Sequence, residues 1–244
     1  MLAVIRRYSI LAARWMGSVM TFLVCVGMVL VCILSMQGYA MYERAIKQKP
    51  VRCLVEQLRS DPSFVTIDQL PEIYVDAVVA VEDKRFWSHG GVDLLATVRA
   101  LGYDIFTLSF AQGGSTITQQ LAKNQYFTQD KTLVRKFAEV FAAWELERCC
   151  TKAEILEMYV NTIYFGSGYE GISQAAKGYF GTTPAKLTDA QAVMLAGLPN
   201  APSVYSLDEN PTLARQRMRQ VLDSMVKCRV ITEQRAQELM DQAP

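Results

Sequence analysis

The sequence predicts a mostly α domain behind a single N-terminal transmembrane helix. One long run near the N-terminus is apolar and uncharged, which is typical of a membrane span. After Pro71, apolar residues recur mostly at the three- and four-residue spacing of amphipathic helices, and little of the chain alternates as a strand does. The 244 residues suffice for one span and one domain of about 200 residues.

The transmembrane helix is expected within residues 15–42, which contain no charged residue. Its apolar stretch, residues 16–36, reaches the ~20 residues that a span requires. A cleaved signal peptide is the alternative, but its apolar core would be only ~7 to 15 residues long. We therefore expect a retained anchor. Arg6, Arg7 and Arg14 precede it, which places the N-terminus in the cytoplasm and the remainder outside.

Four segments follow from this pattern. Residues 1–14 form a cytoplasmic N-terminus, 15–42 the anchor, 43–64 a polar stalk, and 65–244 the folded domain. Three of the 25 basic residues precede the span, so the rest of the chain has 22 basic and 24 acidic residues. This near-neutral balance argues against nucleic acid as a partner.

The six cysteines indicate neither a zinc site nor a disulfide framework, because no CxxC spacing occurs and Cys25 and Cys32 lie in the span. One bridge among the other four is chemically feasible in an oxidising compartment, but no spacing selects a pair. We predict no disulfide.

The helices of the domain are predicted from capping signals and periodicity. Pro71 opens a helix that ends near Glu82. Residues 132–148 predict an amphipathic helix. Its apolar stripe is Leu133, Phe137, Val140, Phe141 and Trp144. Capping boxes at 151–154 and 188–191 open two more helices. Two last helices are expected near 213–227 and 232–240.

An apolar segment, residues 94–114, has Arg99 and Asp104 as its only charges. It is either part of the domain core or an interfacial segment that lies against the bilayer. The second interpretation would suit an enzyme that acts on a lipid.

The stretch "QGGSTITQQLAKN", residues 112–124, predicts a helix with Ser115 as its N-cap. Such a helix start behind Gly113 and Gly114 exposes backbone N–H groups and can bind a phosphate. One face of the helix then has Thr116, Gln119, Gln120 and Lys123. The alternative is a capped helix with a solvated polar face.

A basic cluster follows, formed by Lys131, Arg135 and Lys136 around Glu139. Arg135 and Glu139 could be no more than an exposed ion pair, worth ~0.3 to 0.5 kcal/mol. Together with Lys123, however, the cluster suits a diphosphate bridged by a divalent metal ion.

The stretch "AVEDKRFWSHGGVD", residues 80–93, brings two carboxylates to the end of an apolar helix. Burial of either Glu82 or Asp83 would raise its pKa toward the range useful for a general base. The alternative is a solvated helix end, in which Lys84 and Arg85 pair with these acids. His89 is more typical of an orienting hydrogen-bond partner than of a catalyst.

These segments resemble motifs of the peptidoglycan glycosyltransferases of glycosyltransferase family 51. "VEDKRFWSHGGVD" resembles the first motif, "GGSTITQQLAKN" the second and "RKFAE" the third. "KAEILEMYVNTIYFGSGYEGISQAAKGYFG" and "AVMLAGLPNAPSVYSL" resemble the fourth and fifth. All five occur in order over roughly residues 65–225, which is far more specific than one motif alone.

The resemblance implies a lysozyme-like, two-lobed helical domain that polymerises lipid II into glycan strands. It further implies a monofunctional protein of the bacterial inner membrane, with residues 65–244 as its extracytoplasmic glycosyltransferase domain. The implied partners are lipid II, the growing glycan strand, the bilayer and other cell-wall synthesis proteins.

The resemblance also assigns residues. Glu82 matches the catalytic base, and Glu139 matches a second catalytic glutamate near an expected Mg²⁺ or Mn²⁺ ion. Positions expected to bind substrate are Asp83, Phe86, His89, Gly114, Ser115, Thr116, Gln119, Gln120, Lys123, Asn124, Lys131 and Arg135. Lys131 stands where the family often has arginine, and Ala138 where a lysine is common, which weakens the expected phosphate site.

Other interpretations stay open at this point. Two carboxylates could instead cut finished glycan, as in a hydrolase or lytic transglycosylase. A scaffold protein without catalysis is the alternative from another class. In the fourth motif, Glu157 and Asn161 are expected to brace the cleft. "SMVK" at 224–227 has the SxxK form of penicillin-binding enzymes, but no KTG follows, so we interpret it as a chance match.

Overall fold

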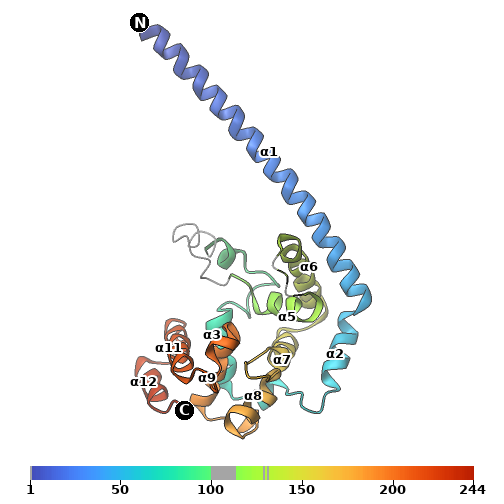
Figure 1. Ribbon diagram of the computed structural model, residues 1–244, viewed down its shortest axis with the longest axis vertical. Coiled ribbons are helices and arrows are strands. Elements are labelled where there is room, and N and C mark those ends of the chain that lie inside the picture. Colours follow the sequence, from blue (N-terminus) through green and yellow to red (C-terminus); the bar gives the residue numbers. More distant parts are fainter. Residues whose placement is uncertain (1, 100–113, 129, 131) are drawn as a thin grey trace.

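The computed structural model describes residues 2–99, 114–128, 130 and 132–244, with side chains from residue 15 onward. Within these residues the secondary structure is helical, apart from an isolated antiparallel bridge between Tyr164 and Glu170. The prediction of a mostly α chain with a long N-terminal helix is confirmed (Figure 1).

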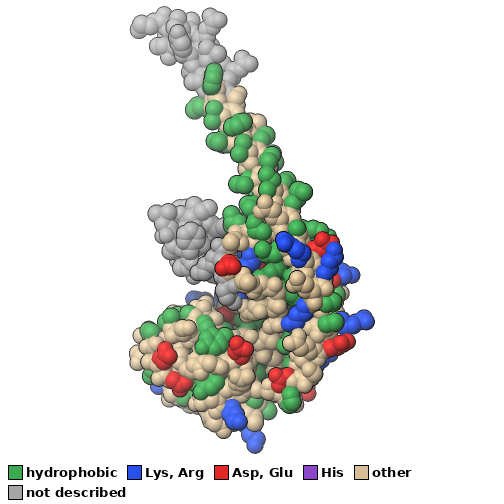
Figure 2. Space-filling model, turned by 45° about the vertical axis from the view of Figure 1, so that its right-hand side comes forward, with side chains coloured by type: hydrophobic (Ala, Val, Ile, Leu, Met, Phe, Trp, Pro, Cys, Tyr) green, Lys and Arg blue, Asp and Glu red, His purple; other side chains and the backbone are tan. Residues whose placement is uncertain are grey.

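The N-terminal helix α1 runs without a break from Leu2 to Gln48. Its part from Trp15 onward is long and apolar enough to cross a membrane, and the protein buries none of its most apolar window. Figure 2 shows hydrophobic side chains around this helix where it projects from the domain. Exposed apolar side chains on every face of a helix are typical of a segment that lies in lipid.

The lower end of α1 packs against α6 (Leu133–Cys149). The Phe141 ring contacts those of Tyr39 and Tyr42, with centroids 5.4 and 6.0 Å away. Gly38 marks the closest approach, because a Cβ built there would lie 2.5 Å from Cβ of Phe137. The anchor is therefore part of the folded structure at this end.

This packing explains where the apolar stripe predicted on α6 lies. The stripe does not face the core: Leu133 and Trp144 are 67% and 52% exposed, and Phe137 and Phe141 face α1. The buried face of α6 instead consists of Ala138, Glu139, Ala142, Ala143 and Leu146. The larger side chains thus serve the contact with the anchor, while small residues allow α6 to approach the core closely.

The segment expected as a stalk, residues 43–64, is helical over most of its length. Helix α1 continues to Gln48, and α2 (Val51–Arg59) follows it after a short break. Val51 and Leu54 are buried in the same core as the rest of the domain. The folded unit therefore begins before residue 65.

The remaining helices form two groups (Figure 1). In one, α3 (Glu72–Glu82) packs with α9 (Asp189–Gly197) and α11 (Pro211–Lys227), and α12 (Glu233–Asp241) packs on α11. In the other, α5 (Ile117–Tyr126) packs on both α6 and α7 (Lys152–Thr162). The other elements are η1 (Ile67–Gln69) before α3, α8 (Gly171–Phe180) and η2 (Pro184–Lys186) between α7 and α9, and η3 (Leu198–Asn200) and α10 (Pro202–Tyr205) between α9 and α11.

The capping boxes predicted at 151–154 and 188–191 are confirmed. The Thr151 and Thr188 hydroxyls each accept a hydrogen bond from the backbone N–H three residues later. The returning side chains, Glu154 and Gln191, accept from the backbone N–H groups of those threonines. These bonds satisfy N–H groups that a helix start otherwise leaves unpaired, and so fix where α7 and α9 begin.

Only the first part of the apolar segment 94–114 is described. Residues 94–99 form a short helix, in which Leu94, Leu95 and Val98 are exposed. This part is therefore not domain core. Residues 100–113 lie outside the described residues.

Replacing Gly38 with leucine should destabilise the protein. The new side chain would overlap Phe137 and the α6 backbone, and overpacking of this kind typically costs about 1 to 3 kcal/mol of unfolding free energy. Thermal unfolding of the detergent-solubilised protein measures the change. Gly27→Leu is the matched control, because a Cβ at Gly27 meets nothing within 4 Å. Equal melting temperatures for both variants would contradict the tight α1–α6 contact.

Candidate active site

Glu82 is the last residue of α3 and lies in a cavity of about 510 Å³. Its side chain is 9% exposed. The cavity walls come from both groups of helices and from the loops beside them. The lining residues that can bind or react are Glu82, Asp83, Lys84, Arg85, Asp93, Arg99, Ser115, Thr116, Gln120, Lys123, Asn200, Arg217 and Ser224.

The two carboxylate oxygens of Glu82 have different surroundings. Oε2 accepts a hydrogen bond of 2.8 Å from the Gln120 side-chain amide. The Tyr159 hydroxyl donates to the other end of that amide and so fixes its orientation. Oε1 is buried and accepts no hydrogen bond from the described residues; an ion-pair contact joins it to Arg217, with Nη2 at 3.7 Å. One carboxylate oxygen is thus hydrogen-bonded, whereas the other lacks a donor.

Burial raises the pKa of Glu82, while the hydrogen bond from Gln120 and the charge of Arg217 act in the opposite direction. A carboxylate with a raised pKa is a stronger base than one in water, as the sequence predicted for this helix end.

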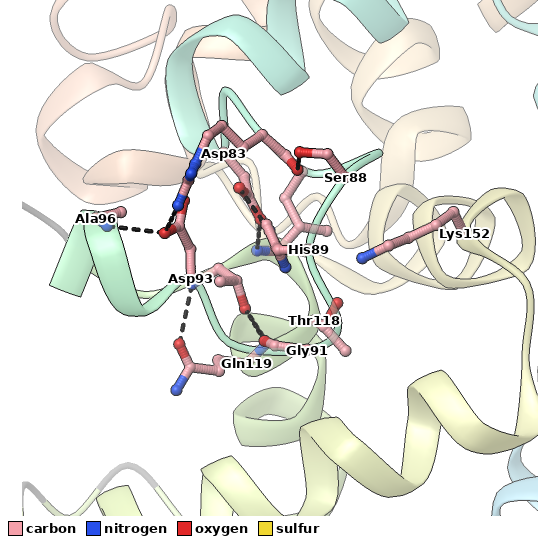
Figure 3. A network of polar contacts seen from close by, with 12 residues as sticks. Asp83, Ser88, His89, Gly91, Asp93, Ala96, Thr118, Gln119 and Lys152 are labelled. Atoms are coloured by element: carbon pink, nitrogen blue, oxygen red, sulfur yellow. Dashed lines mark hydrogen bonds and ion pairs between the residues drawn. The ribbon is translucent and has the colours of Figure 1, made fainter.

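Asp83 follows Glu82, is buried, and contacts His89 on the loop that comes after α3 (Figure 3). Its carboxylate forms a hydrogen bond of 2.9 Å with His89 Nε2 and accepts another of 3.0 Å from the backbone N–H of Ile117. Burial raises the pKa of Asp83, although both hydrogen bonds counteract this. Phe86 is fully buried, with the Lys152 ammonium 4.5 Å from its ring centroid. Phe86 and His89 therefore lie behind the cavity wall.

A second buried carboxylate, Asp93, shapes the entry to the short helix 94–99. It accepts hydrogen bonds from the Arg85 guanidinium and from the backbone N–H of Ala96. The hydrogen bond from Arg85 is the main reason why the pKa of Asp93 falls to about 2. Arg85 is thus neutralised by Asp93, whereas Lys84 and Arg99 also line the cavity without such a partner among the described residues.

The start of α5 differs from its prediction. Thr116, not Ser115, is the N-cap, and it forms a capping box with Gln119. The N–H of Ile117 donates to Asp83, and the N–H of Gln119 donates to the Thr116 hydroxyl. These two N–H groups are therefore already bonded within the protein. The side chains on the next turns of this helix are better candidates for binding a phosphate than these N–H groups.

Lys123 provides such a side chain. It lies one turn after Gln120 on α5 and lines the same cavity as Glu82. Burial lowers the pKa of Lys123, and its ammonium has no hydrogen-bond or ion-pair partner among the described residues. A half-buried cation without a partner is a good site for an anion. Gly114 also lines the cavity, whereas Gln119 and Asn124 do not.

Two members of the predicted basic cluster, Arg135 and Lys136, contact Glu139. This carboxylate is 2% exposed. Its Oε1 lies 2.9 Å from Arg135 Nε, at an angle too poor for a hydrogen bond, and its Oε2 accepts from Lys136 at 3.0 Å. The Lys136 ammonium also donates to the Ser115 hydroxyl, which lines the cavity. Lys131 lies outside the described residues.

Glu139 does not form a metal site together with its neighbours. Both of its oxygens face side-chain cations, which a metal ion would have to displace. Among the described residues, no group of three or more His, Cys, Asp or Glu could hold a metal ion. The residues around Glu139 therefore fit a divalent ion poorly, unless another molecule supplies further ligands.

Glu157 and Asn161 brace the fold at a distance from this cavity. Glu157 accepts from the backbone N–H of Ile67, and Asn161 both accepts from and donates to the backbone of Val65. Neither side chain lines the cavity. These bonds attach the segment before α3 to α7, so the two residues brace this segment rather than the wall of the cavity.

The sequence analysis missed Arg217, which belongs to a helix predicted only as amphipathic. Two other arginines, Arg215 and Arg219, occur on that helix, and spacing alone does not distinguish the one that faces the cavity. Ser224, from the SxxK match, also lines the cavity, as does Asn200. Their positions depend on how α11 packs against α3 and α9.

Comparison with known proteins identifies the family. Residues 49–226 match the family described as "Transglycosylase". This chain belongs to the transglycosylase family. The resemblance of its five motifs to peptidoglycan glycosyltransferases is thereby confirmed, and this transglycosylase is an enzyme of that general class.

Two proteins are similar in sequence to this transglycosylase. It is 43% identical over 183 residues to a provisionally named transglycosylase of Cupriavidus necator, covering 75% of this chain and 79% of that protein. It is 42% identical over 179 residues to penicillin-binding protein 1A of Neisseria gonorrhoeae, covering 73% of this chain. It spans only 22% of the length of that second relative.

A crystal structure of penicillin-binding protein 1A from Haemophilus influenzae also matches this transglycosylase. The TM-score is 0.44 at 20% identity, over 74% of this chain and 17% of that one. That similarity is too low to support conclusions about the site, which rest on the geometry above.

Proposed function

We propose that this transglycosylase polymerises lipid II into peptidoglycan glycan strands. The growing strand would pass from undecaprenyl diphosphate to the 4-hydroxyl of the N-acetylglucosamine of an acceptor lipid II, with inversion at the sugar carbon. One observation carries the proposal: a buried carboxylate with a free oxygen and a cation without a partner line the same cavity.

Glu82 acts as the general base in this proposal. Its free Oε1 accepts the proton of the acceptor hydroxyl while that oxygen attacks C1 of the donor sugar. Oε2 stays bound to Gln120, which keeps the carboxylate in place during the transfer. A general base positioned in this way contributes ~10² to 10⁴ in rate.

The leaving group is a diphosphate, which departs as an anion when the bond from C1 to its oxygen breaks. Lys123 and Glu82 line the same cavity, and their charges interact. Lys136 and Arg135 lie farther along, beyond Ser115. Fixed cations favour this departure because they stabilise charge that develops in the transition state.

The supporting argument against glycan hydrolysis concerns the leaving group. An alkoxide that leaves must receive a proton from an acid, but both oxygens of Glu139 face cations. A diphosphate needs only positive charge. The cations of the cavity and of α6 therefore favour transfer over a hydrolase or lytic enzyme.

The membrane arrangement is part of the proposal. Helix α1 crosses the bacterial inner membrane with its N-terminus in the cytoplasm, so the domain lies outside. The short helix 94–99 lies on the side of the domain from which α1 projects (Figure 1). Its exposed Leu94, Leu95 and Val98 suit contact with the bilayer, where a lipid-linked substrate resides.

Glu82→Gln should reduce lipid II polymerisation by ~10² to 10⁴, because the amide cannot accept the hydroxyl proton. The measurement is the initial rate of glycan formation by the purified full-length protein. Glu72→Gln is the matched control, since Glu72 is exposed at the other end of the same helix. An unchanged rate for Glu82→Gln would exclude this residue as the base.

Lys123→Met should lower the rate by roughly 10²-fold, because one cation that stabilises the leaving diphosphate is lost. Methionine keeps most of the aliphatic volume, so the melting temperature should change little. Lys177→Met, on the exposed side of α8, is the control for removing one positive charge. Near wild-type turnover in Lys123→Met would place the diphosphate site elsewhere.

The expected Mg²⁺ or Mn²⁺ ion is retained as a proposal in which phosphate oxygens supply most of its ligands. A chelator should then slow polymerisation reversibly without changing the melting temperature, because Glu139 is already neutralised by Arg135 and Lys136. Restoration of the rate by added Mg²⁺ is the positive result. A rate that is insensitive to chelation would remove the ion from the proposal.

A further inference from the structure

We propose that Arg217 is a positioning residue that selects Oε1 of Glu82 as the atom that receives the proton. This inference rests on the proposed function, because it assigns a part in the same transfer to a residue outside the five motif matches that suggested the site.

The Arg217 side chain is fixed by three neighbours. Its Nε donates to the backbone carbonyl of Gly197 at 3.1 Å. Its Nη1 donates to the Gln220 side chain at 3.0 Å, and its guanidinium lies 5.9 Å from the ring centroid of Tyr205. With Nε and Nη1 occupied, Nη2 is the group that faces Glu82.

A glycine makes this arrangement possible. A Cβ built at Gly197 would lie 3.0 Å from Cγ of Arg217 and 3.1 Å from Cγ2 of Val221. Gly197 itself has an ordinary right-handed helical backbone, so another residue is compatible with its conformation. What the glycine provides is space: a Cβ here would require the stem of Arg217 to shift by a few tenths of an ångström.

The distance between Arg217 and Glu82 explains why the contact suits a base. At 3.7 Å, Nη2 attracts the carboxylate but is too far to donate a hydrogen bond to Oε1. A shorter contact would occupy the lone pair that must accept the substrate proton. Because Gln120 holds Oε2, the charge of Arg217 keeps the carboxylate ionised while Oε1 stays free.

The charged and titratable groups around Glu82 act in both directions. Burial raises the pKa of Glu82, and Asp83 on the same helix end adds to this. Arg217 from α11 and Lys123 from α5 lower it, and the Tyr159 hydroxyl from α7 lies close enough to interact with the carboxylate. Removal of Arg217 therefore raises the pKa of Glu82 further, so the base needs a higher pH to be ionised.

The test is the pH profile of polymerisation by full-length Arg217→Gln. The acidic limb, the part of the profile in which the rate rises as Glu82 ionises, should move to higher pH. Activity that is lost at low pH should therefore return at alkaline pH. Below the limb, the rate falls about tenfold for each pH unit of the shift. Arg217→Lys should move the acidic limb less than Arg217→Gln does. Lysine keeps the positive charge, although it lacks the planar, forked guanidinium group of arginine.

Arg219→Gln is the matched control. Arg219 lies on the same helix and is exposed outside the cavity, so its loss changes the net charge equally. Its profile should match that of the wild type. A limb that is unshifted in Arg217→Gln, or equally shifted in Arg219→Gln, would overturn the inference.

Gly197→Ala provides a second variant that keeps Arg217. The methyl group should displace the guanidinium and move the acidic limb in the same direction as Arg217→Gln. An unshifted acidic limb in Gly197→Ala would contradict the role of Gly197 in positioning the Arg217 side chain. The outcome is separable from that of the proposed function: if Glu82→Gln retains its rate, both fail, whereas an inactive Glu82→Gln with unshifted Arg217 profiles removes only this inference.

Discussion

The arrangement of the site depends on the bond between Asp83 and the start of α5. The Asp83 carboxylate follows α3 directly and accepts the backbone N–H of Ile117, which lies 34 residues later in the chain. This bond joins the end of one helix to the beginning of another. It thereby brings Glu82, one residue before Asp83, opposite Gln120 and Lys123 on α5. His89 completes the contact from the loop beneath.

Two neighbouring carboxylates thus have different tasks because their surroundings differ. Asp83 is saturated by donors from its own protein and holds the structure together. Glu82 is equally enclosed but has one oxygen without a donor. An unsatisfied buried oxygen costs free energy in the resting protein, typically about 1 to 3 kcal/mol. Such a cost is common where a protein prepares a group for chemistry, since the missing hydrogen bond forms when substrate arrives.

The sequence predicted the helices well where local chemistry decides them. Thr151 and Thr188 each have a capping partner three residues later, and α7 and α9 begin there. At α5 two adjacent residues, Ser115 and Thr116, can both cap a helix. The choice of Thr116 follows from its tertiary hydrogen bond to the carbonyl of Gly91, which no local pattern contains.

The sequence left open what tertiary packing decides. The apolar stripe of α6 was correctly recognised, but periodicity does not tell whether a stripe faces the core, another helix or lipid. For α6 the partner is α1, which lies outside the domain core. Arg217 was missed for a similar reason: its role comes from Gly197 and Glu82, which are 20 and 135 residues away. Glu82 and Lys123 line one cavity; the chemistry of the residues pointed to Lys123 and to either Glu82 or Asp83, and the family resemblance selected Glu82.

The continuity of α1 has a mechanical consequence. The helix runs unbroken from its apolar part to Gln48 and is interlocked with α6 at Gly38. The domain therefore cannot swivel on its anchor as it would on a loose tether. Any turn of the domain about the membrane normal has to turn the embedded helix as well, against the viscosity of the surrounding lipid. In the proposed polymerisation, the strand would therefore leave a domain whose rotation is coupled to that of its anchor.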